Sequence, residues 1–584
     1  MPSGNLILVA ALLLPAGMLA QQPKDWVAKS NENARLVIEA RVKFLPEGAS
    51  QQGITTLDSE ISSLPTDRTE KYRAASQTAL AQLNQRMEAE TDKNVKQDLQ
   101  ILIDAVDRQI RMIDATSKVF LPYTDVAGLI FQGEKSLLDD QVAENRRPAA
   151  LVRLKKYTGV EPGFVPLTQQ AEARFREKAA NPALIGPAKE EVEKDLQNAS
   201  AYVDGIGILM EKYRVKGSEE ALGKLRQQVA EYGDFVRKEV LPRSRSDFRL
   251  PPDIYKLGLE GYGVDYLPED LVKVAHTGFL DIQREMAPIA ARIAKARKLP
   301  SSDYRSVIRA LKKEQFAGDE ILPKYEAVLK QIEEIIRKNH LLTLPERPAI
   351  ISIASAAETA QQPAPHMQPP PMLNNHGERG KFVLPLATKG ANGVELKYDD
   401  FTFAAASWTL TAHEARPGHE LQFDSMVEHG VSLARALFAF NSTNVEGWGL
   451  YAEWFTLPYM PDEGKLISLQ FRLLRAARAF IDPELQMGKL TPAQAMRILE
   501  NDVVGSKAFA TEEVERYTFR SPGQAVSYYD GYTRLLAIRQ FTEKALGKNF
   551  NVQKFHDFVL GQGLLPPDLL WRAVTEEFLP SQVK

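Results

Sequence analysis

The segment 413–419, with the sequence HEARPGH, has the side chains of a zinc-protease motif but not its usual spacing. In the usual motif, His-Glu-x-x-His, both imidazoles lie on one face of a helix and the Glu is the general base. Here the second His stands six positions after the first, and at about 100° per residue a straight helix would point their rings about 120° apart. Pro417 removes a backbone donor and Gly418 tolerates almost any φ/ψ. We therefore predict a bend at Pro417-Gly418 that brings His419 beside His413.

A carboxylate further along the chain completes a possible metal site. Glu446 lies in the segment 444–453, NVEGWGLYAE. Two His and one carboxylate leave a position open for water, which is typical of a catalytic zinc site. Two alternatives stay open from the residues alone. The His pair could pack within a helix, and Glu446 could be an acid near a helix start, because the preceding residues 441–444, NSTN, are capping types.

Composition excludes several classes of protein. The chain has 584 residues and a formal net charge of −3, which argues against a nucleic-acid partner because such proteins usually carry a basic excess. It contains no cysteine, which excludes disulfides, thiolate metal sites and cysteine nucleophiles. No Gly-x-Ser-x-Gly elbow is present, so a serine hydrolase is not expected.

The first residues read as a signal peptide. Residues 6–14 form an apolar run that is too short to span a bilayer, and small residues lead to Ala20. We predict a signal peptide over residues 1–20, cleavage after Ala20, and a periplasmic or secreted protein. Without a cysteine there is no lipid-attachment site, and no other apolar run approaches membrane-spanning length.

Periodicity divides the rest of the chain into two parts. Residues 21–242 are highly charged, with apolar positions at helical spacing, and predict a helical scaffold lobe. Residues 243–584 are predicted to form a catalytic lobe with the metal motif. Before the motif, short strands are expected at 348–354, 380–386 and 395–398, and residues 361–371 are expected to be a loop. Pro385 suits an edge strand, which could hold an extended peptide by main-chain pairing.

Several segments together resemble one bacterial family. They are HEARPGHELQ at 413–422, EGWGLYAE at 446–453, SPGQAVSY at 521–528, and the stretches 475–482 and 555–566. With these motifs the chain resembles the family labelled domain of unknown function 885, whose members look like zincin-type metallopeptidases. The resemblance implies a mainly helical, two-lobed zincin-like peptidase with a cleft and a small sheet beside the active-site helix.

The same resemblance implies roles for individual residues. His413, His419 and Glu446 would bind Zn²⁺, and Glu414 would be the general base. This chain departs from the family pattern at two positions. Tyr529 stands where members often have Lys, and Gln486 stands where a His is common. Neither departure removes an expected zinc ligand.

The chemistry also needs a donor for the oxyanion that forms during hydrolysis. Tyr528 is our first candidate, because a phenol hydroxyl on the opposite wall can donate without adding charge. Tyr529 and Tyr532 are alternatives, and Tyr528 could equally be a core residue. The side chains considered for substrate contact or for orienting a ligand imidazole are Gln422, Asp424, Glu453, Gln524, Tyr529 and Tyr532.

The sequence thus predicts a zinc-dependent peptidase that hydrolyses short peptides by activated water with Glu414 as base. Two alternatives remain. One is a catalytically inactive peptide-binding or scaffold protein of the same fold. The other is a zinc amidohydrolase that acts on non-peptide amides.

Overall fold

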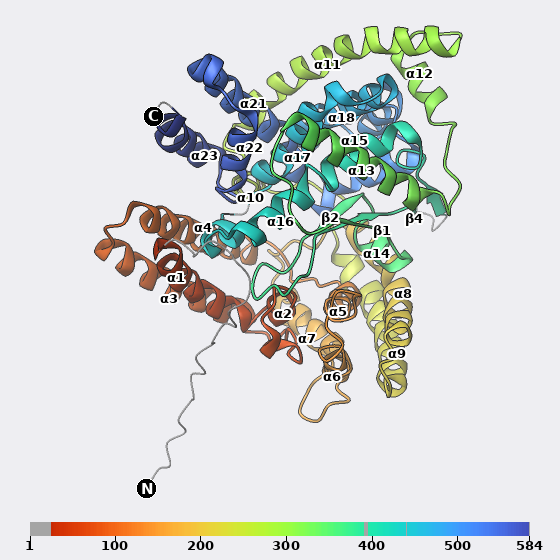
Figure 1. Ribbon diagram of the computed structural model, residues 1–584. Coiled ribbons are helices and arrows are strands. Elements are labelled where there is room, and N and C mark those ends of the chain that lie inside the picture. Colours follow the sequence, from red (N-terminus) through yellow and green to blue (C-terminus); the bar gives the residue numbers. More distant parts are fainter. Residues whose placement is uncertain (1–24, 390–394, 440, 583–584) are drawn as a thin grey trace.

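Helices form most of the molecule in a computed structural model, which describes residues 25–389, 395–439 and 441–582 (Figure 1). The predicted signal peptide lies outside these residues. None of the helices in the described ranges combines the length and the apolar composition needed to cross a membrane. The mainly helical fold class is as expected from the periodicity.

The amino-terminal half consists of helices joined by short connections. They are α1 (Asp25–Val42), α2 (Pro46–Gln51), α3 (Arg68–Ala89), α4 (Lys93–Ser117), α5 (Val126–Lys135), α6 (Pro148–Thr158), α7 (Leu167–Ala179), α8 (Lys189–Lys212), α9 (Glu219–Phe235) and α10 (Pro252–Gly261). Helices α3, α4 and α8 lie within residues 21–242, for which the apolar spacing predicts helices.

The second half begins with long helices and continues with the segments that build the site. They are α11 (Pro268–Arg297), α12 (Tyr304–Leu311), α13 (Ile321–Asn339), α14 (Ala356–Gln361), α15 (Ala404–Glu414), α16 (His419–His429), α17 (Ser442–Thr456), α18 (Asp462–Gln486), α19 (Pro492–Arg497), α20 (Lys507–Glu515), α21 (Ser527–Leu546), α22 (Val552–Leu560), α23 (Pro567–Ala573) and α24 (Leu579–Gln582). Helix α18 is buried along nearly its whole length and packs against α11, α15 and α21.

Two large hydrophobic cores are present, and the division between them does not follow residue 242. The second core is made mainly by α5 to α9. Helices α1, α3 and α4 contribute instead to the main core, together with the helices of the second half. A buried ion pair between Asp98 and Arg435, 2.9 Å between Oδ1 and Nε, ties α4 to that half. Amphipathic spacing shows that a helix has an apolar face but not which partner covers it.

The small sheet has strand order β1-β3-β2, with β1 (Ile350–Ile353) parallel and β2 (His366–Gln368) antiparallel to β3 (Lys381–Leu384). Two predictions about it were wrong. The 380–386 segment supplies the central strand, and Pro385 lies just after its end rather than on an edge. The expected loop at 361–371 contains β2, which is an edge strand, because pairing with β3 offsets its high proline content. A separate hairpin pairs β4 (Ala387–Lys389) with β5 (Glu395–Lys397).

Candidate metal centre

The two motif histidines lie on different helices that meet at a sharp bend. Helix α15 ends at Glu414 and α16 begins at His419. At the bend, the Trp448 indole Nε1 donates to the carbonyl oxygen of Pro417 at 2.9 Å. Gly418 is held so close to the preceding turn that a Cβ there would lie 1.9 Å from the His413 carbonyl oxygen. The bend expected at Pro417-Gly418 is therefore present, and it requires a residue without a side chain.

This close approach predicts the effect of Gly418→Ala. The added methyl would collide with the backbone carbonyls of Ala412 and His413 and cannot be accommodated without moving α16. We expect a loss of about 1–3 kcal/mol in the free energy of unfolding and weaker metal binding, measured by thermal unfolding and zinc titration. Gly223→Ala, in a helix position with nothing within 4 Å of the new Cβ, is the matched control. Equal behaviour of the two variants would contradict the prediction.

The bend brings three potential ligands together. The rings of His413 and His419 are 4.6 Å apart between centroids. The Nε2 atoms of His413 and His419 lie 3.4 and 3.2 Å from Oε2 of Glu446, which projects from α17. The three donor atoms are all within 4.8 Å of one another. Burial alone would raise the pKa of Glu446, but its hydrogen bonds with both imidazoles hold that pKa well below its usual range.

The donor set fits a zinc ion. Ligand atoms about 2.0–2.1 Å from zinc at tetrahedral angles stand about 3.3–3.4 Å apart, close to the two distances observed. A second hydrogen bond of His413 sets which of its ring nitrogens carries the proton. Its Nδ1 lies 2.7 Å from Oε1 of Glu453, so in the neutral ring Nδ1 carries the proton and the Nε2 lone pair faces Glu446. These two acceptors repel each other unless something lies between them: either a proton on Nε2, which makes the hydrogen bond to Glu446, or a cation.

Glu453 holds the His413 ring in place. It is buried on α17, and its second oxygen accepts a hydrogen bond from Thr409 at 2.5 Å. Burial would raise the pKa of Glu453, yet Arg475 and the bond from His413 hold it below its usual value. Gly449 leaves room for the ring, since a Cβ there would lie 2.6 Å from it. Of the residues considered for orienting an imidazole, Glu453 has the required geometry.

We expect Glu453→Gln to weaken zinc binding about 10- to 100-fold, because carboxylates that fix a ligand imidazole contribute this much in other zinc sites. The measurement is competition with a chelator of known affinity. The amide can still contact Thr409 but removes the charge that stabilises the His413 tautomer. An unchanged zinc affinity would show that Glu453 contributes only to packing and does not orient His413 for metal binding.

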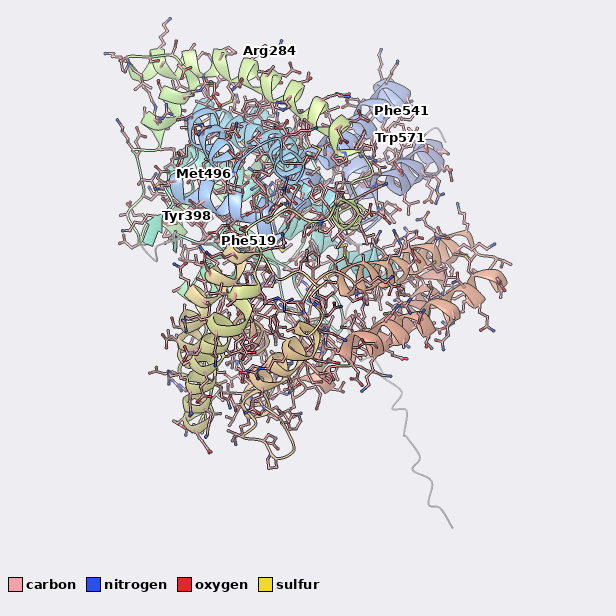
Figure 2. The ribbon with its side chains drawn as sticks, turned by 180° about the vertical axis from the view of Figure 1, so that it is seen from behind. Arg284, Tyr398, Met496, Phe519, Phe541 and Trp571 are labelled. Carbon is pink, nitrogen blue, oxygen red and sulfur yellow. The ribbon has the colours of Figure 1, made fainter. Side chains whose placement is uncertain are left out.

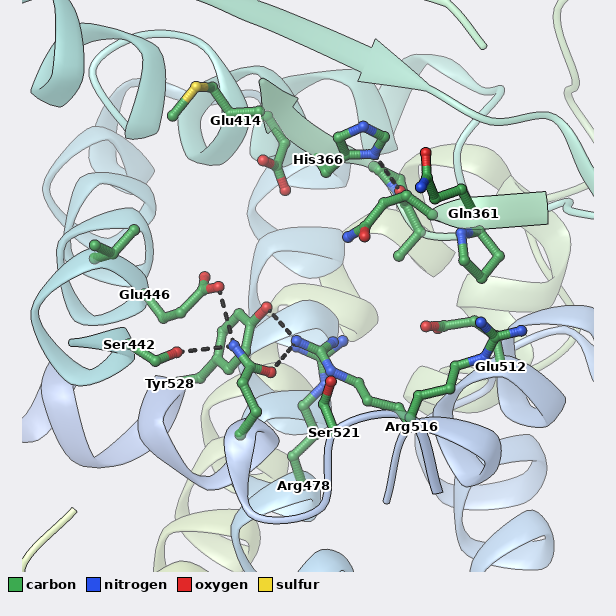
Figure 3. A pocket seen from close by; sticks show the side chains of 18 of the residues that line it. Gln361, His366, Glu414, Ser442, Glu446, Arg478, Glu512, Arg516, Ser521 and Tyr528 are labelled. Carbon is green, nitrogen blue, oxygen red and sulfur yellow. Dashed lines mark hydrogen bonds between the residues drawn. The ribbon is translucent and has the colours of Figure 1, made fainter. Parts of the chain in front are cut away.

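A cavity of about 740 Å³ opens beside these ligands (Figure 3). Glu414, His419, Glu446 and Tyr528 line one part of it. Burial raises the pKa of Glu414 to about 8, although His419 opposes the shift. A bound divalent cation would favour the charged carboxylate and lower this pKa. Two of the three potential ligands and the predicted base thus face one space large enough for a small substrate.

Only one of the three candidate tyrosines lines this cavity. The Tyr528 ring stacks with that of His413 at 6.2 Å between centroids, and its hydroxyl accepts a hydrogen bond from Arg516 at 2.7 Å. Tyr529 faces α11, where a Cβ on Gly278 would collide with its hydroxyl. Tyr532 lies under Arg472, 5.2 Å from the ring centroid. Geometry therefore retains Tyr528 and places the other two away from the ligands.

The remaining predicted side chains differ in position. Gln524 lies 3.4 Å from Oε1 of Glu446 through its Nε2 and also lines the cavity. Gln422 instead donates to Asn444 at 2.9 Å. Asp424 accepts from the backbone of Gly380 at 3.1 Å, which anchors the sheet to α16. Gln422 and Asp424 therefore bind other parts of the fold and not the ring of a potential ligand. As a result, Nδ1 of His419 has no hydrogen-bond partner among the described residues.

Comparison with known proteins agrees with the resemblance noted in the motifs. The family described as "Bacterial protein of unknown function (DUF885)" matches residues 46–574. The chain belongs to this family. A search of curated proteins found no match.

Two solved structures share the fold of this DUF885 protein. The "putative lipoprotein" of Colwellia psychrerythraea aligns with a TM-score of 0.75 at 18% identity, over 94% of this chain and 99% of its own. The "putative lipoprotein of unknown function" of Shewanella oneidensis aligns with a TM-score of 0.68 at 18% identity, over 94% of this chain and 100% of its own. At this identity the likeness concerns the fold.

The two departures from the family pattern lie outside the part of the cavity that holds the ligands. Gln486 bridges two backbone segments, accepting from Leu250 at 2.9 Å and donating to Tyr517 at 2.8 Å. Tyr529 packs on α11, as described above. Both substitutions in this DUF885 chain therefore serve helix packing.

Sequence reasoning missed part of the cavity wall. This part includes four arginines of the second half, Arg475, Arg478, Arg516 and Arg520. It also includes three carboxylates near the second core: Asp125, which caps α5, and Glu191 and Asp195 on α8. Arg475 and Arg478 lie in a motif segment, so their position on a buried helix was the available signal. The acidic residues gave none, because they lie some 200 residues or more before the motif and are joined to it only by the packing of the two cores.

Proposed function

We propose that this protein is a zinc-dependent peptidase that hydrolyses short peptides. The observation that carries the proposal is the convergence of His413, His419 and Glu446 beside a cavity that His419, Glu446 and Glu414 line. Two imidazoles and one carboxylate are a donor set typical of catalytic rather than structural zinc. A catalytically inactive scaffold would have no need to keep all four groups together.

A zinc ion bound by these ligands would polarise the scissile carbonyl and acidify a water molecule. Glu414 accepts the proton of the attacking water and delivers it to the leaving nitrogen. Tyr528 donates its hydroxyl proton to the developing oxyanion, since its own oxygen is already held by Arg516. Glu453 and Gln524 keep His413 and Glu446 in position.

The cavity favours peptides over simple amides. Its volume of about 740 Å³ and its mixture of apolar, acidic and basic side chains suit a substrate of a few residues. Edge strand β2 borders the same cavity through His366 and Met367, which offers main-chain pairing to an extended peptide. These features support peptide hydrolysis ahead of action on small non-peptide amides.

We propose that the protein is exported and is periplasmic or secreted. The signal-like segment 1–20 supports export. The structural neighbours described as lipoproteins agree with such a location.

The test compares the zinc-loaded protein with Glu414→Gln on a mixed peptide library and on simple amides. Cleavage of peptides by the wild type alone would support the proposal. Cleavage of simple amides only would identify an amidohydrolase. Absence of zinc from both proteins under metal-replete conditions would overturn the metal-dependent function.

A further inference from the structure

The cavity contains an arginine whose hydrogen bonds go to neutral groups. All four of its arginines lie within 4.0 Å of a carboxylate, but they are not held alike. Arg475 lies 3.7 Å from Glu453, and Arg520 bonds Glu515 at 3.1 Å. Arg478 makes a two-pronged contact with Glu513, with 2.7 Å between Nε and Oε2. The fourth, Arg516, is different.

Among the described residues, the hydrogen bonds of Arg516 go to two neutral groups. Its Nη2 donates to the amide oxygen of Gln524 and to the Tyr528 hydroxyl (Figure 3). The nearest carboxylate oxygen, on Glu513, is 3.7 Å away and is already shared with Arg478. The Arg516 side chain is 14% exposed and lines the cavity. Because its nearest carboxylate is distant and shared with Arg478, a closer anion from a ligand would fit beside Arg516.

Glu512, which lies near Arg516, does not supply this anion. Glu512 also borders the cavity, but burial raises its pKa to about 8. At neutral pH this carboxyl is mostly protonated and brings little negative charge. The positive charge of Arg516 therefore remains available to a ligand.

The distance from Arg516 to the metal centre sets where the anion would sit on a peptide. One amide group, that of Gln524, separates the guanidinium from the Glu446 carboxylate. An extended peptide advances about 3.3–3.6 Å per residue, so a group bound at Arg516 lies one or two residues from a carbonyl at the metal centre. The planar fork of arginine is the protein group best matched to a carboxylate.

We propose that Arg516 binds the C-terminal carboxylate of the substrate, so that the enzyme removes one or two residues from the C-terminus of short peptides. This inference rests on the proposed function. The bound peptide would thus point its carboxylate at Arg516 and place its scissile carbonyl at the candidate metal centre.

The experiment uses one mixed library of N-acetylated tripeptides, prepared as free acids and as C-terminal amides. Cleavage by the zinc-loaded wild type is followed by mass spectrometry, and binding to Glu414→Gln is followed by equilibrium dialysis. A charge-assisted hydrogen bond to the carboxylate should favour the free acids about 10- to 100-fold in kcat/KM and in affinity. Arg516→Gln should bring both ratios close to one, and Arg516→Lys should restore them in part.

Arg520→Gln is the matched control, because it removes the same charge from the same wall without touching Gln524 or Tyr528 and should keep the preference for acids. Equal cleavage of acids and amides would overturn this inference while leaving a peptidase. Preferential binding of acids without cleavage would support the subsite and overturn the proposed function. If amides are cleaved only next to Asp or Glu, Arg516 binds a side-chain carboxylate and the terminal assignment is wrong. If neither the free acids nor the amides bind, both proposals are overturned.

Discussion

Glu414→Gln is expected to lower kcat for peptide hydrolysis about 10²- to 10⁴-fold. The amide is nearly isosteric with the carboxylate but cannot accept the proton of the attacking water. Because Glu414 is not one of the three converging donors, zinc content should stay at the wild-type value. The measurements are steady-state rates on one cleaved peptide and metal analysis of the same preparations.

The matched control is Glu420→Gln. Glu420 is also buried and lies close by, but it pairs with Arg416 at 2.7 Å on the scaffold side of α16. Its replacement should change stability more than kcat per folded enzyme. Full activity of Glu414→Gln with zinc bound would remove Glu414 from the mechanism and require another base.

His419→Ala is expected to abolish stoichiometric zinc binding. With the wild type, zinc at a free concentration about 1,000 times its Kd should raise the free energy of unfolding by about 4 kcal/mol, since only the folded chain holds the three ligands together. The variant should show little of this stabilisation. The measurements are metal content by elemental analysis and thermal unfolding with and without zinc.

The exposed His376, on the segment between β2 and β3, provides the control for this effect. His376→Ala should bind zinc and be stabilised like the wild type. Zinc-dependent stabilisation that survives in His419→Ala would place the ion elsewhere in the protein. A loss in both variants would point to a general effect of removing an imidazole.

Local pattern was sufficient for the helices and for part of the site. Apolar residues at helical spacing predicted α3, α4 and α8 because each buries one face. Pro417 and Gly418 predicted the bend because their backbone restrictions are local properties. Prediction failed in the sheet, where pairing with β3 made an edge strand of the Pro-rich segment around His366.

The sequence by itself determined the residue types of the candidate metal centre, the bend between its two histidines and the mainly helical class. Only the tertiary structure decided which tyrosine and which carboxylate face the ligands. Tyr528 and Tyr529 are adjacent in sequence, yet α21 turns one toward His413 and the other toward α11. Tertiary packing likewise sets Arg516 against Gln524 and Tyr528, with the nearest carboxylate oxygen, on Glu513, 3.7 Å away. Such choices depend on contacts between segments far apart in the chain, which no local periodicity records.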